Sequence, residues 1–173
     1  MNILFVCLGN ICRSPLAAGI MKAIYEELQI DGLVESAGTA NFNVGNPADH
    51  RSIKVAAEAG IDITDHRARQ VTASDFERFD LIYVMDRDNE RALLSIAPPA
   101  ARAKIRRICA PAASASAAHS AAHSAAHSAS ASARHIADVP DPYHGEMSHF
   151  REVFHLLHER CHHIAKSLEE GLR

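Results

Sequence analysis

The stretch NILFVCLGNICRSPLAAGIMKAIYEELQ, residues 2–29, contains a predicted strand, a loop and a predicted helix in direct succession. Residues 2–6 form a short apolar run that suits a buried strand. Over residues 15–29, large apolar side chains recur at every fourth position, on one helical face: Leu16, Ile20, Ile24 and Leu28. We expect Ser14 to cap this helix and Pro15 to lie in its first turn. The octapeptide CLGNICRS is then a loop between a strand and a helix.

Strand and helix signals alternate along the rest of the chain. Further strands are predicted at residues 33–36, 81–85 and 104–109. Further helices are predicted at residues 48–59, 72–79 and 86–97, and a last helix carries an apolar face from Phe150 to Leu168. Strands separated by helices form parallel sheets that are covered by helices on both faces. We therefore expect one α/β domain with a four-stranded parallel sheet between two helical layers.

One segment, residues 112–134, departs from this pattern, because it consists of 12 Ala, 7 Ser, 3 His and Arg134. Side chains this small cannot build a hydrophobic core. We interpret the segment as a flexible insertion in a loop, so that a single domain spans residues 1–173.

The overall composition excludes several classes of function. The formal charge of −3 predicts no strongly basic surface for nucleic acid or acidic lipid. No apolar run approaches the roughly 20 residues of a transmembrane helix, and the N-terminus does not resemble a secretory signal. The four cysteines are too scattered for a disulfide framework, which favours a reducing cytoplasm.

The loop at residues 7–14 carries the strongest functional signal. Ligands of open α/β sheets bind at the carboxyl ends of strands, and a loop that enters a helix directs backbone N–H groups at one point. We expect Gly9 to let the loop curl and the planar fork of Arg13 to match two phosphate oxygens. The same donors favour a thiolate at Cys7, which would be a nucleophile directed at phosphorus.

Such a nucleophile needs a proton donor for the departing oxygen. Asp141, in the Pro-bounded loop Asp141-Pro142-Tyr143, is the candidate general acid. Taken alone, this tripeptide is more typical of a turn with a capping aspartate. The phosphate loop elsewhere in the chain favours the catalytic interpretation.

Seven segments together resemble the bacterial low-molecular-weight protein tyrosine phosphatases: CLGNICRS at 7–14, SAGT at 36–39, GNP at 45–47, HRARQ at 66–70, DLI at 80–82, MD at 85–86 and DVPDPY at 138–143. The resemblance covers nearly the whole chain except residues 112–134. It implies that family's flavodoxin-like fold and the hydrolysis of phosphotyrosine through a phosphocysteine. It assigns the nucleophile to Cys7, the phosphate-binding arginine to Arg13 and the general acid and base to Asp141.

The resemblance also implies supporting roles. The phosphate-binding loop would comprise Leu8, Gly9, Asn10, Ile11, Cys12 and Ser14, and the Ser14 hydroxyl would assist the leaving thiolate. A hydrogen-bond network that shapes the loop would involve Asn10, Ser36 and His66. An aromatic wall for the substrate ring would consist of Phe42 and Tyr143. His144 stands where the family often has a second aromatic residue.

The implied partners are phosphotyrosine proteins, among them a bacterial tyrosine kinase. We expect a monomer or a weak dimer that binds no nucleic acid and does not insert into membranes. We expect no metal or cofactor, because the loop itself supplies the positive field. His155, His158, His162 and His163 on the last helix have no carboxylate or cysteine set beside them, so we interpret them as solvated.

Three other functions share parts of this pattern. A thiol-linked arsenate reductase would need a resolving pair of cysteines, and Cys109 and Cys161, which we expect in the core, do not resemble one. A protein-arginine phosphatase of this fold carries Thr in place of Ile11, whose apolar side chain favours an aromatic ring. A phosphate-binding module without turnover would need neither Cys7 nor Asp141.

Overall fold

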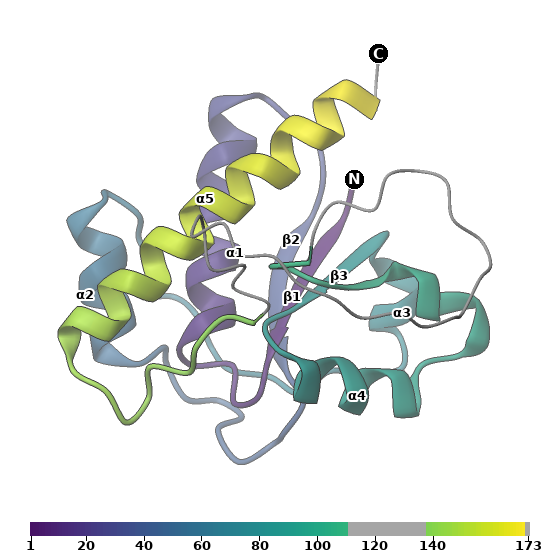
Figure 1. Cartoon of the computed structure of the whole chain (residues 1–173), viewed down its shortest axis with the longest axis horizontal. Helices are drawn as coiled ribbons and strands as arrows, with labels where there is room; N and C mark the ends of the chain where they lie inside the picture. Colours follow the sequence, from purple (N-terminus) through teal and green to yellow (C-terminus); the bar gives the residue numbers. More distant parts are fainter. Residues whose placement is uncertain (111–137, 172–173) are drawn as a thin grey trace, which may run out of the picture.

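Four parallel strands form a sheet at the centre of the structure, a computed structural model that describes residues 1–110 and 138–171 (Figure 1). The strands are β1 (Ile3–Cys7), β2 (Val34–Gly38), β3 (Leu81–Val84) and β4 (Ile105–Arg107). Their order in the sheet is β2-β1-β3-β4. The expectation of a four-stranded parallel sheet is confirmed, whereas the predicted insertion at 112–134 lies outside the described residues.

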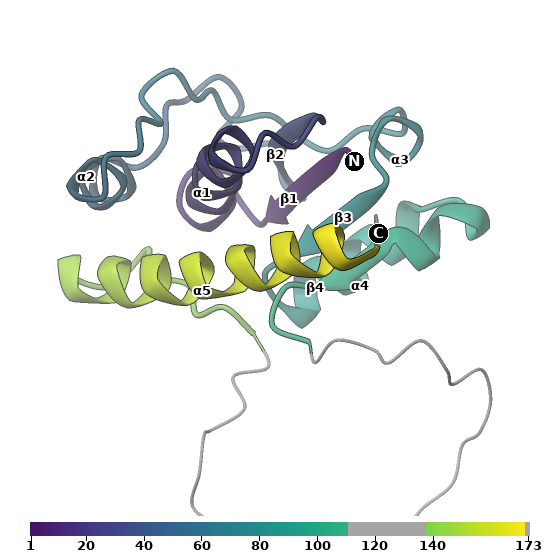
Figure 2. The same cartoon turned by 90° about the horizontal axis from the view of Figure 1, so that it is seen from above.

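Helices cover both faces of this sheet, as the sequence predicts. They are α1 (Arg13–Glu27), α2 (His50–Glu58), α3 (Asp75–Arg78), α4 (Arg87–Ile96), the 3₁₀ helix η1 (Pro99–Lys104) and α5 (Met147–Gly171). Helices α1 and α5 pack on one face with α2 against them, and α3 and α4 lie on the other face (Figure 2). No described helix is both long and apolar enough to cross a membrane.

Strand β1 is completely buried because both of its faces meet helices. Ile3 and Phe5 belong to the core beneath α1 and α5, whereas Leu4 and Val6 belong to the core beneath α3 and α4. Two-sided burial explains why residues 3–7 form a continuous apolar run and not an alternating one.

The start of α1 differs from the prediction. The helix begins at Arg13, Cys12 occupies the N-cap position, and no side chain caps it. The prediction that Ser14 caps this helix is therefore wrong. The Ser14 hydroxyl lies 3.0 Å from Cys7 Sγ and accepts a hydrogen bond from Asn10, so the demands of the loop outweigh the capping preference of serine.

Helices α2 and α3 start later than predicted, and an aspartate side chain stabilises the start of each. Helix α2 is capped by Asp49, whose side chain accepts a hydrogen bond from the Arg51 N–H. Before α3, the Thr72 N–H donates to the Asp75 carboxylate at 2.8 Å, which is the carboxylate half of the predicted capping box.

The carboxyl ends of β1 and β3 bring three polar segments together. The 7–14 loop follows β1, and Asp86 follows β3, where its side chain caps α4 through the Asn89 N–H. The 138–145 loop is attached here as well, because the Val139 N–H donates to the Met85 carbonyl at 2.8 Å. The sequence segments with the strongest chemical signals therefore meet at one edge of the sheet.

Candidate active site

The 7–14 loop curls around the sulfur of Cys7. Its five successive carbonyl groups at residues 7–11 each accept a hydrogen bond from outside the loop. The donors, in order, are Thr39 N–H (2.9 Å), Ala40 N–H (3.0 Å), the Asn43 side-chain amide (3.2 Å), His66 Nε2 (2.7 Å) and Asp49 N–H (2.8 Å). Because the N–H and C=O of a planar trans peptide point in opposite directions, the N–H groups of residues 8–12 face the inside of the loop.

These inward N–H groups form an anion site. The Asn10 N–H donates to Cys7 Sγ at 3.3 Å. The other four have no acceptor within the part of the chain that the structure describes: Leu8, Gly9, Ile11 and Cys12. The first turn of α1 adds further N–H groups that an α-helix leaves unpaired. A tetrahedral oxyanion such as phosphate matches this ring of donors.

Asn10 supplies the sharp turn in the loop. Its backbone is left-handed, with φ 55°, a conformation that asparagine tolerates better than most residues. Its fully buried side-chain amide donates to Ser14 Oγ and to Ser36 Oγ, both at 2.9 Å, and its Oδ1 accepts from the Arg69 N–H. The structure thus brings Asn10, Ser14 and Ser36 into one network.

Gly9 has a role different from the expected one. Its φ is not positive, so it does not supply the turn. A Cβ at this position would instead lie 2.6 Å from Asn43 Nδ2, the donor that holds the Gly9 carbonyl. A Cβ at position 9 would displace the Asn43 side chain and weaken its hydrogen bond to the Gly9 carbonyl, which favours glycine here.

His66 supports Asn10 from behind the loop. Its Nε2 lies 2.7 Å from the Asn10 carbonyl oxygen, which can only accept, so Nε2 carries the proton. Burial lowers the pKa of His66, partly opposed by this hydrogen bond, and the nearby Lys22 and Arg67 lower it further. The neutral imidazole is therefore favoured. His66 and Ser36 both contact the loop at Asn10, His66 at its carbonyl oxygen and Ser36 at its side-chain amide.

Cys7 and Ser14 share a short contact at the centre of the loop. Cys7 Sγ lies 3.0 Å from Ser14 Oγ, and the cysteine is 3% exposed. The Asn10 amide already donates to Ser14 Oγ, which leaves the single hydroxyl proton of Ser14 for Cys7 Sγ or for the more distant Ala37 carbonyl at 3.4 Å. A thiolate at Cys7 would attract that proton.

Arg13 lies beside the loop with its guanidinium held on several sides. Nη1 donates to Asp86 at 2.7 Å and to the Val139 carbonyl at 3.1 Å, and Nη2 donates to Asp141 at 3.0 Å. Burial alone would lower the pKa of Arg13, but the charges of Cys7 and Asp141 and the bond to Asp86 raise it. The sequence analysis assigned no role in the site to Asp86, although Asp86 directly follows a predicted strand and belongs to one of the segments that carry the resemblance.

Asp141 lies at the mouth of the site. Its side chain is 48% exposed, its Oδ2 accepts from Arg13, and its Oδ1 accepts from the Tyr143 N–H at 3.1 Å. The loop and Asp141 are more than a hundred residues apart in sequence, and the structure brings them together through Arg13.

A pocket of about 310 Å³ opens above the loop. Cys7 and Arg13 line its floor, and Asp141 lies on its side. Phe42 and Tyr143 form exposed aromatic walls, at 66% and 48% exposure. The rim also includes His144, whose ring meets that of Tyr143 edge-on.

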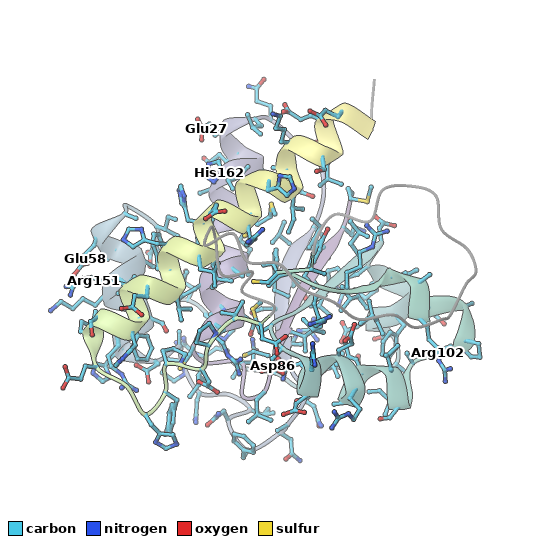
Figure 3. All side chains as sticks on the ribbon, in the orientation of Figure 1. Glu27, Glu58, Asp86, Arg102, Arg151 and His162 are labelled. Atoms are coloured by element: carbon cyan, nitrogen blue, oxygen red, sulfur yellow. The ribbon has the colours of Figure 1, made fainter. Side chains whose placement is uncertain are left out.

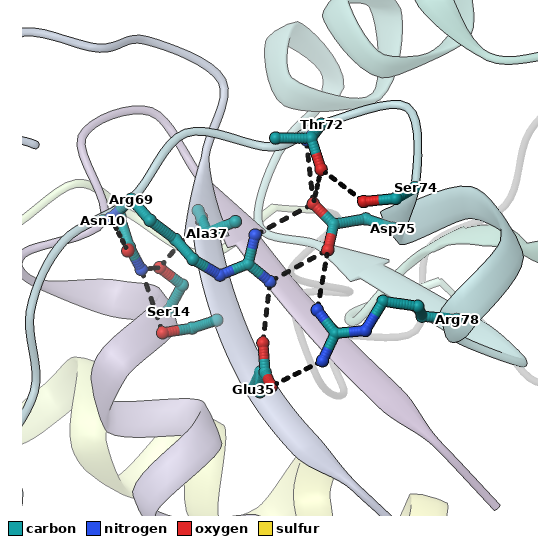
Figure 4. A network of polar contacts seen from close by, with 10 residues as sticks. Asn10, Ser14, Glu35, Ala37, Arg69, Thr72, Ser74, Asp75 and Arg78 are labelled. Atoms are coloured by element: carbon teal, nitrogen blue, oxygen red, sulfur yellow. Dashed lines mark hydrogen bonds and ion pairs between the residues drawn. The ribbon is translucent and has the colours of Figure 1, made fainter.

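An ion-pair network supports the loop from the other side of β2 (Figure 4). The Arg69 guanidinium binds both oxygens of the fully buried Asp75 at 2.9 and 3.0 Å, and it also binds Glu35 at 2.9 Å. The Arg69 backbone N–H holds Asn10 Oδ1 at 2.9 Å. Sequence reasoning assigned no role to Arg69, because its partners come from three separate segments.

The remaining cysteines differ from Cys7. Cys109 and Cys161 are fully buried in the core, which confirms their predicted position. Cys12 is also buried, and burial together with nearby negative charge raises its pKa, so its thiol keeps its proton. All four cysteines are free. Among the described residues, no group of three His, Cys, Asp or Glu side chains is arranged to hold a metal ion.

The sequence is similar to that of known phosphatases along its whole length. The profile of the family described as low molecular weight phosphotyrosine protein phosphatase matches residues 2–173. A putative low molecular weight protein-tyrosine-phosphatase of Synechocystis is 35% identical, over 99% of both chains. Low molecular weight protein-tyrosine phosphatase A of Mycobacterium tuberculosis is 36% identical, over 91% of this chain and 85% of its own length.

Solved structures show the same similarity in three dimensions. The crystal structure of a protein tyrosine phosphatase from Entamoeba histolytica superposes with a TM-score of 0.82 at 33% identity, and it covers 100% of this chain and 99% of its own. The structure of YfkJ from Bacillus subtilis superposes with a TM-score of 0.80 at 29% identity, over 100% and 97% of the two chains.

Proposed function

Because the chain belongs to the low molecular weight phosphotyrosine protein phosphatase family, it is a protein tyrosine phosphatase, and we propose that Cys7 is the nucleophile of its reaction. One observation carries this assignment: the N–H groups of residues 8–12 face a single point, and Cys7 Sγ lies beneath it. A phosphate bound there would have its phosphorus directly in front of the sulfur.

In the first step, Cys7 Sγ attacks phosphorus, an S–P bond forms, and the P–O bond to the tyrosine ring breaks. Asp141 donates its proton to the departing phenolate oxygen. The loop N–H groups and the Arg13 fork bind the three equatorial oxygens, whose charge they stabilise throughout. The place of Asp141 at the mouth of the pocket supports its role as the acid, because the leaving group departs toward solvent.

In the second step, water attacks the phosphocysteine. Asp141, now ionised, accepts a proton from that water, the S–P bond breaks, and inorganic phosphate leaves. The hydroxyl proton of Ser14, 3.0 Å from Cys7 Sγ, stabilises the thiolate that is released.

We propose that the substrate ring lies between Phe42 and Tyr143, with Ile11 beside it. All three residues line the pocket, and the exposed aromatic walls offer an apolar slot that suits a phenyl ring. Ile11 offers no hydrogen-bond partner to a guanidinium, which disfavours phosphoarginine. An arsenate-reductase route is disfavoured as well, because Cys109 and Cys161 are fully buried in the core.

We further propose phosphotyrosine proteins as the substrates, a bacterial tyrosine kinase among them, and the cytoplasm as the location. The aromatic walls of the pocket, Phe42 and Tyr143, are 66% and 48% exposed. An open pocket of this kind suits a side chain presented by a protein. The four free cysteines suit a reducing compartment. For the assembly, we propose a monomer or a weak dimer.

The roles are tested by comparing kcat/KM for matched phosphotyrosine, phosphoserine and phosphoarginine peptides, in the wild type and in the Cys7→Ser variant. We expect strong preference for phosphotyrosine, and loss of turnover in Cys7→Ser with phosphate binding retained. Substantial turnover by a clean Cys7→Ser preparation would refute the assignment of Cys7 as the nucleophile.

A further inference from the structure

Arg51, in the first turn of α2, contacts the loop that carries Asp141. Its Nη1 donates to the Gly145 carbonyl at 2.9 Å, and its Nη2 donates to the Tyr143 carbonyl at 3.0 Å. These partners lie more than 90 residues away in sequence. Arg51 does not line the pocket, but its guanidinium lies over the Tyr143 ring, 5.8 Å from the centroid, so it acts on the loop and on one wall of the pocket.

The contact at Tyr143 leads directly to Asp141. The Tyr143 carbonyl is held by Arg51, while the N–H of the same residue donates to Asp141 Oδ1 at 3.1 Å. Asp141 Oδ2 is held by Arg13. One oxygen of the carboxylate is therefore oriented by the phosphate-binding arginine, and the other by a backbone group whose residue is bound to Arg51.

Arg51 is itself rigidly fixed. Its Nε and Nη2 bind the two oxygens of Asp49 at 3.0 and 2.8 Å. Burial would raise the pKa of Asp49, but the hydrogen bonds from Arg51 lower it overall. The guanidinium also lies over the Phe150 ring, 4.3 Å from its centroid. A fork held this firmly can fix a loop with little further loss of side-chain freedom.

Asp49 connects this fork to the other half of the site. Its backbone N–H donates to the Ile11 carbonyl at 2.8 Å, one of the five bonds that hold the 7–14 loop. A continuous path of hydrogen bonds thus runs from Ile11 through Asp49 and Arg51 to Tyr143. At its near end, the 138–145 loop is attached through Val139 to Met85, directly after β3, and Arg51 secures the far end.

We propose that Arg51 is a positioning residue for Asp141: it locks the far end of the 138–145 loop to the 7–14 loop, so that the acid stands at a fixed distance from the phosphate. The inference rests on the proposed role of Asp141 as general acid. Lysine cannot replace arginine here, since four hydrogen bonds in one plane require the guanidinium fork.

The test uses two substrates whose leaving oxygens differ in basicity, phosphotyrosine and 4-nitrophenyl phosphate. Only the basic leaving oxygen of phosphotyrosine depends strongly on a proton donor. We expect Arg51→Gln to lower kcat/KM for phosphotyrosine by about tenfold and that for 4-nitrophenyl phosphate by about twofold, because a displaced acid is a weaker donor. Arg51→Lys, which keeps the charge, should show the same selective loss and carries the test if Arg51→Gln does not fold.

The matched control is Arg151→Gln. Arg151 forms a bidentate ion pair with Glu58 between α5 and α2, the pair labelled in Figure 3, without touching the 138–145 loop. Its loss should leave both kcat/KM values within about a factor of two, as expected for an exposed ion pair. This control removes a similar bridge between α2 and the C-terminal part of the chain.

A double variant separates positioning from general damage. In the Asp141→Asn background, which has no acid to position, Arg51→Gln should change kcat/KM for either substrate by less than about twofold. Equal losses on both substrates, or a tenfold loss that persists in that background, would overturn the positioning role. If Asp141→Asn alone slowed both substrates equally, the acid assignment itself would fail, and the inference with it.

Discussion

The guanidinium of Arg13 and the carboxylate of Asp141 form an ion pair, with 3.0 Å between Nη2 and Oδ2, at the side of the pocket. The same guanidinium is held from the opposite side by Asp86 at 2.7 Å. The two carboxylates bind different nitrogens of the same guanidinium, Asp86 at Nη1 and Asp141 at Nη2, and we expect the negative charge of Asp141 to oppose that of a phosphate bound beside it.

Replacing Asp141 should strengthen product binding. In Asp141→Asn, Nη2 of Arg13 is no longer paired with a carboxylate, and a negative charge near the bound phosphate is removed. We expect inorganic phosphate to bind several-fold more tightly, measured as its competitive inhibition constant at neutral pH. Weaker inhibition by phosphate in a folded Asp141→Asn protein would contradict this expectation.

Replacing Asp86 should have the opposite effect. Asp86→Asn keeps a side chain that can cap α4 but loses the charged partner of Arg13. We expect phosphate affinity and kcat/KM to fall by about tenfold, because a charge-assisted bond that orients the fork is lost. Thermal unfolding should change little by comparison. An unaltered inhibition constant would show that Val139 and the loop orient Arg13 without Asp86.

Ile11 should govern the choice between an aromatic ring and a guanidinium. In Ile11→Thr, apolar contact with the ring shrinks and a hydroxyl group enters the pocket wall. We expect the ratio of phosphoarginine to phosphotyrosine kcat/KM to rise, measured with peptides of one sequence. A ratio that stays constant would place the specificity at Phe42 or His144 instead.

His66 should make the fold sensitive to acid. Its pKa is lower in the folded protein than in the unfolded chain, so its contribution to stability is present above the unfolded pKa of about 6.5 and is lost as pH falls through the folded pKa. We expect the free energy of unfolding to decrease between about pH 7 and pH 5. In His66→Gln, which stays neutral and can still donate to Asn10, this decrease should be smaller. If the free energy of unfolding depended on pH in the same way in both proteins, His66 would not be the source of the acid sensitivity.

The sequence predicted those parts of the site that are encoded locally. The strand, loop and helix at residues 2–29 follow from one continuous pattern, which places Cys7 and Arg13 without knowledge of the rest of the fold. The role of Asp141 could be predicted only because the sequence also contains that phosphate-binding loop. The rule that ligands bind at the carboxyl ends of parallel strands predicted the edge of the sheet that holds the site, whereas the strand order is known from the structure alone.

Residues whose roles depend on distant partners were missed. Asp86 reaches Arg13 because β3 lies beside β1, and Arg51 reaches Tyr143 across 92 positions, which no local pattern reveals. The wrong cap at Ser14 has the same origin, since capping preferences describe an isolated helix start, whereas here the Ser14 hydroxyl accepts a hydrogen bond from Asn10 and contacts Cys7 Sγ. Gly9 was recognised as necessary, but for a turn that Asn10 makes.

The five hydrogen bonds that hold the carbonyls of the 7–14 loop also predict which of the donor positions tolerate mutation. Three of the donors are main-chain N–H groups, those of Thr39, Ala40 and Asp49. Any residue other than proline can provide such a donor, so the side chains at positions 39 and 40 are free to change without loosening the loop. The other two donors are the side chains of Asn43 and His66, where the identity of the residue is itself the contact. In a library of mutants selected for activity, substitutions should therefore be frequent at positions 39 and 40 and rare at Asn43 and His66, although all four residues support the same loop.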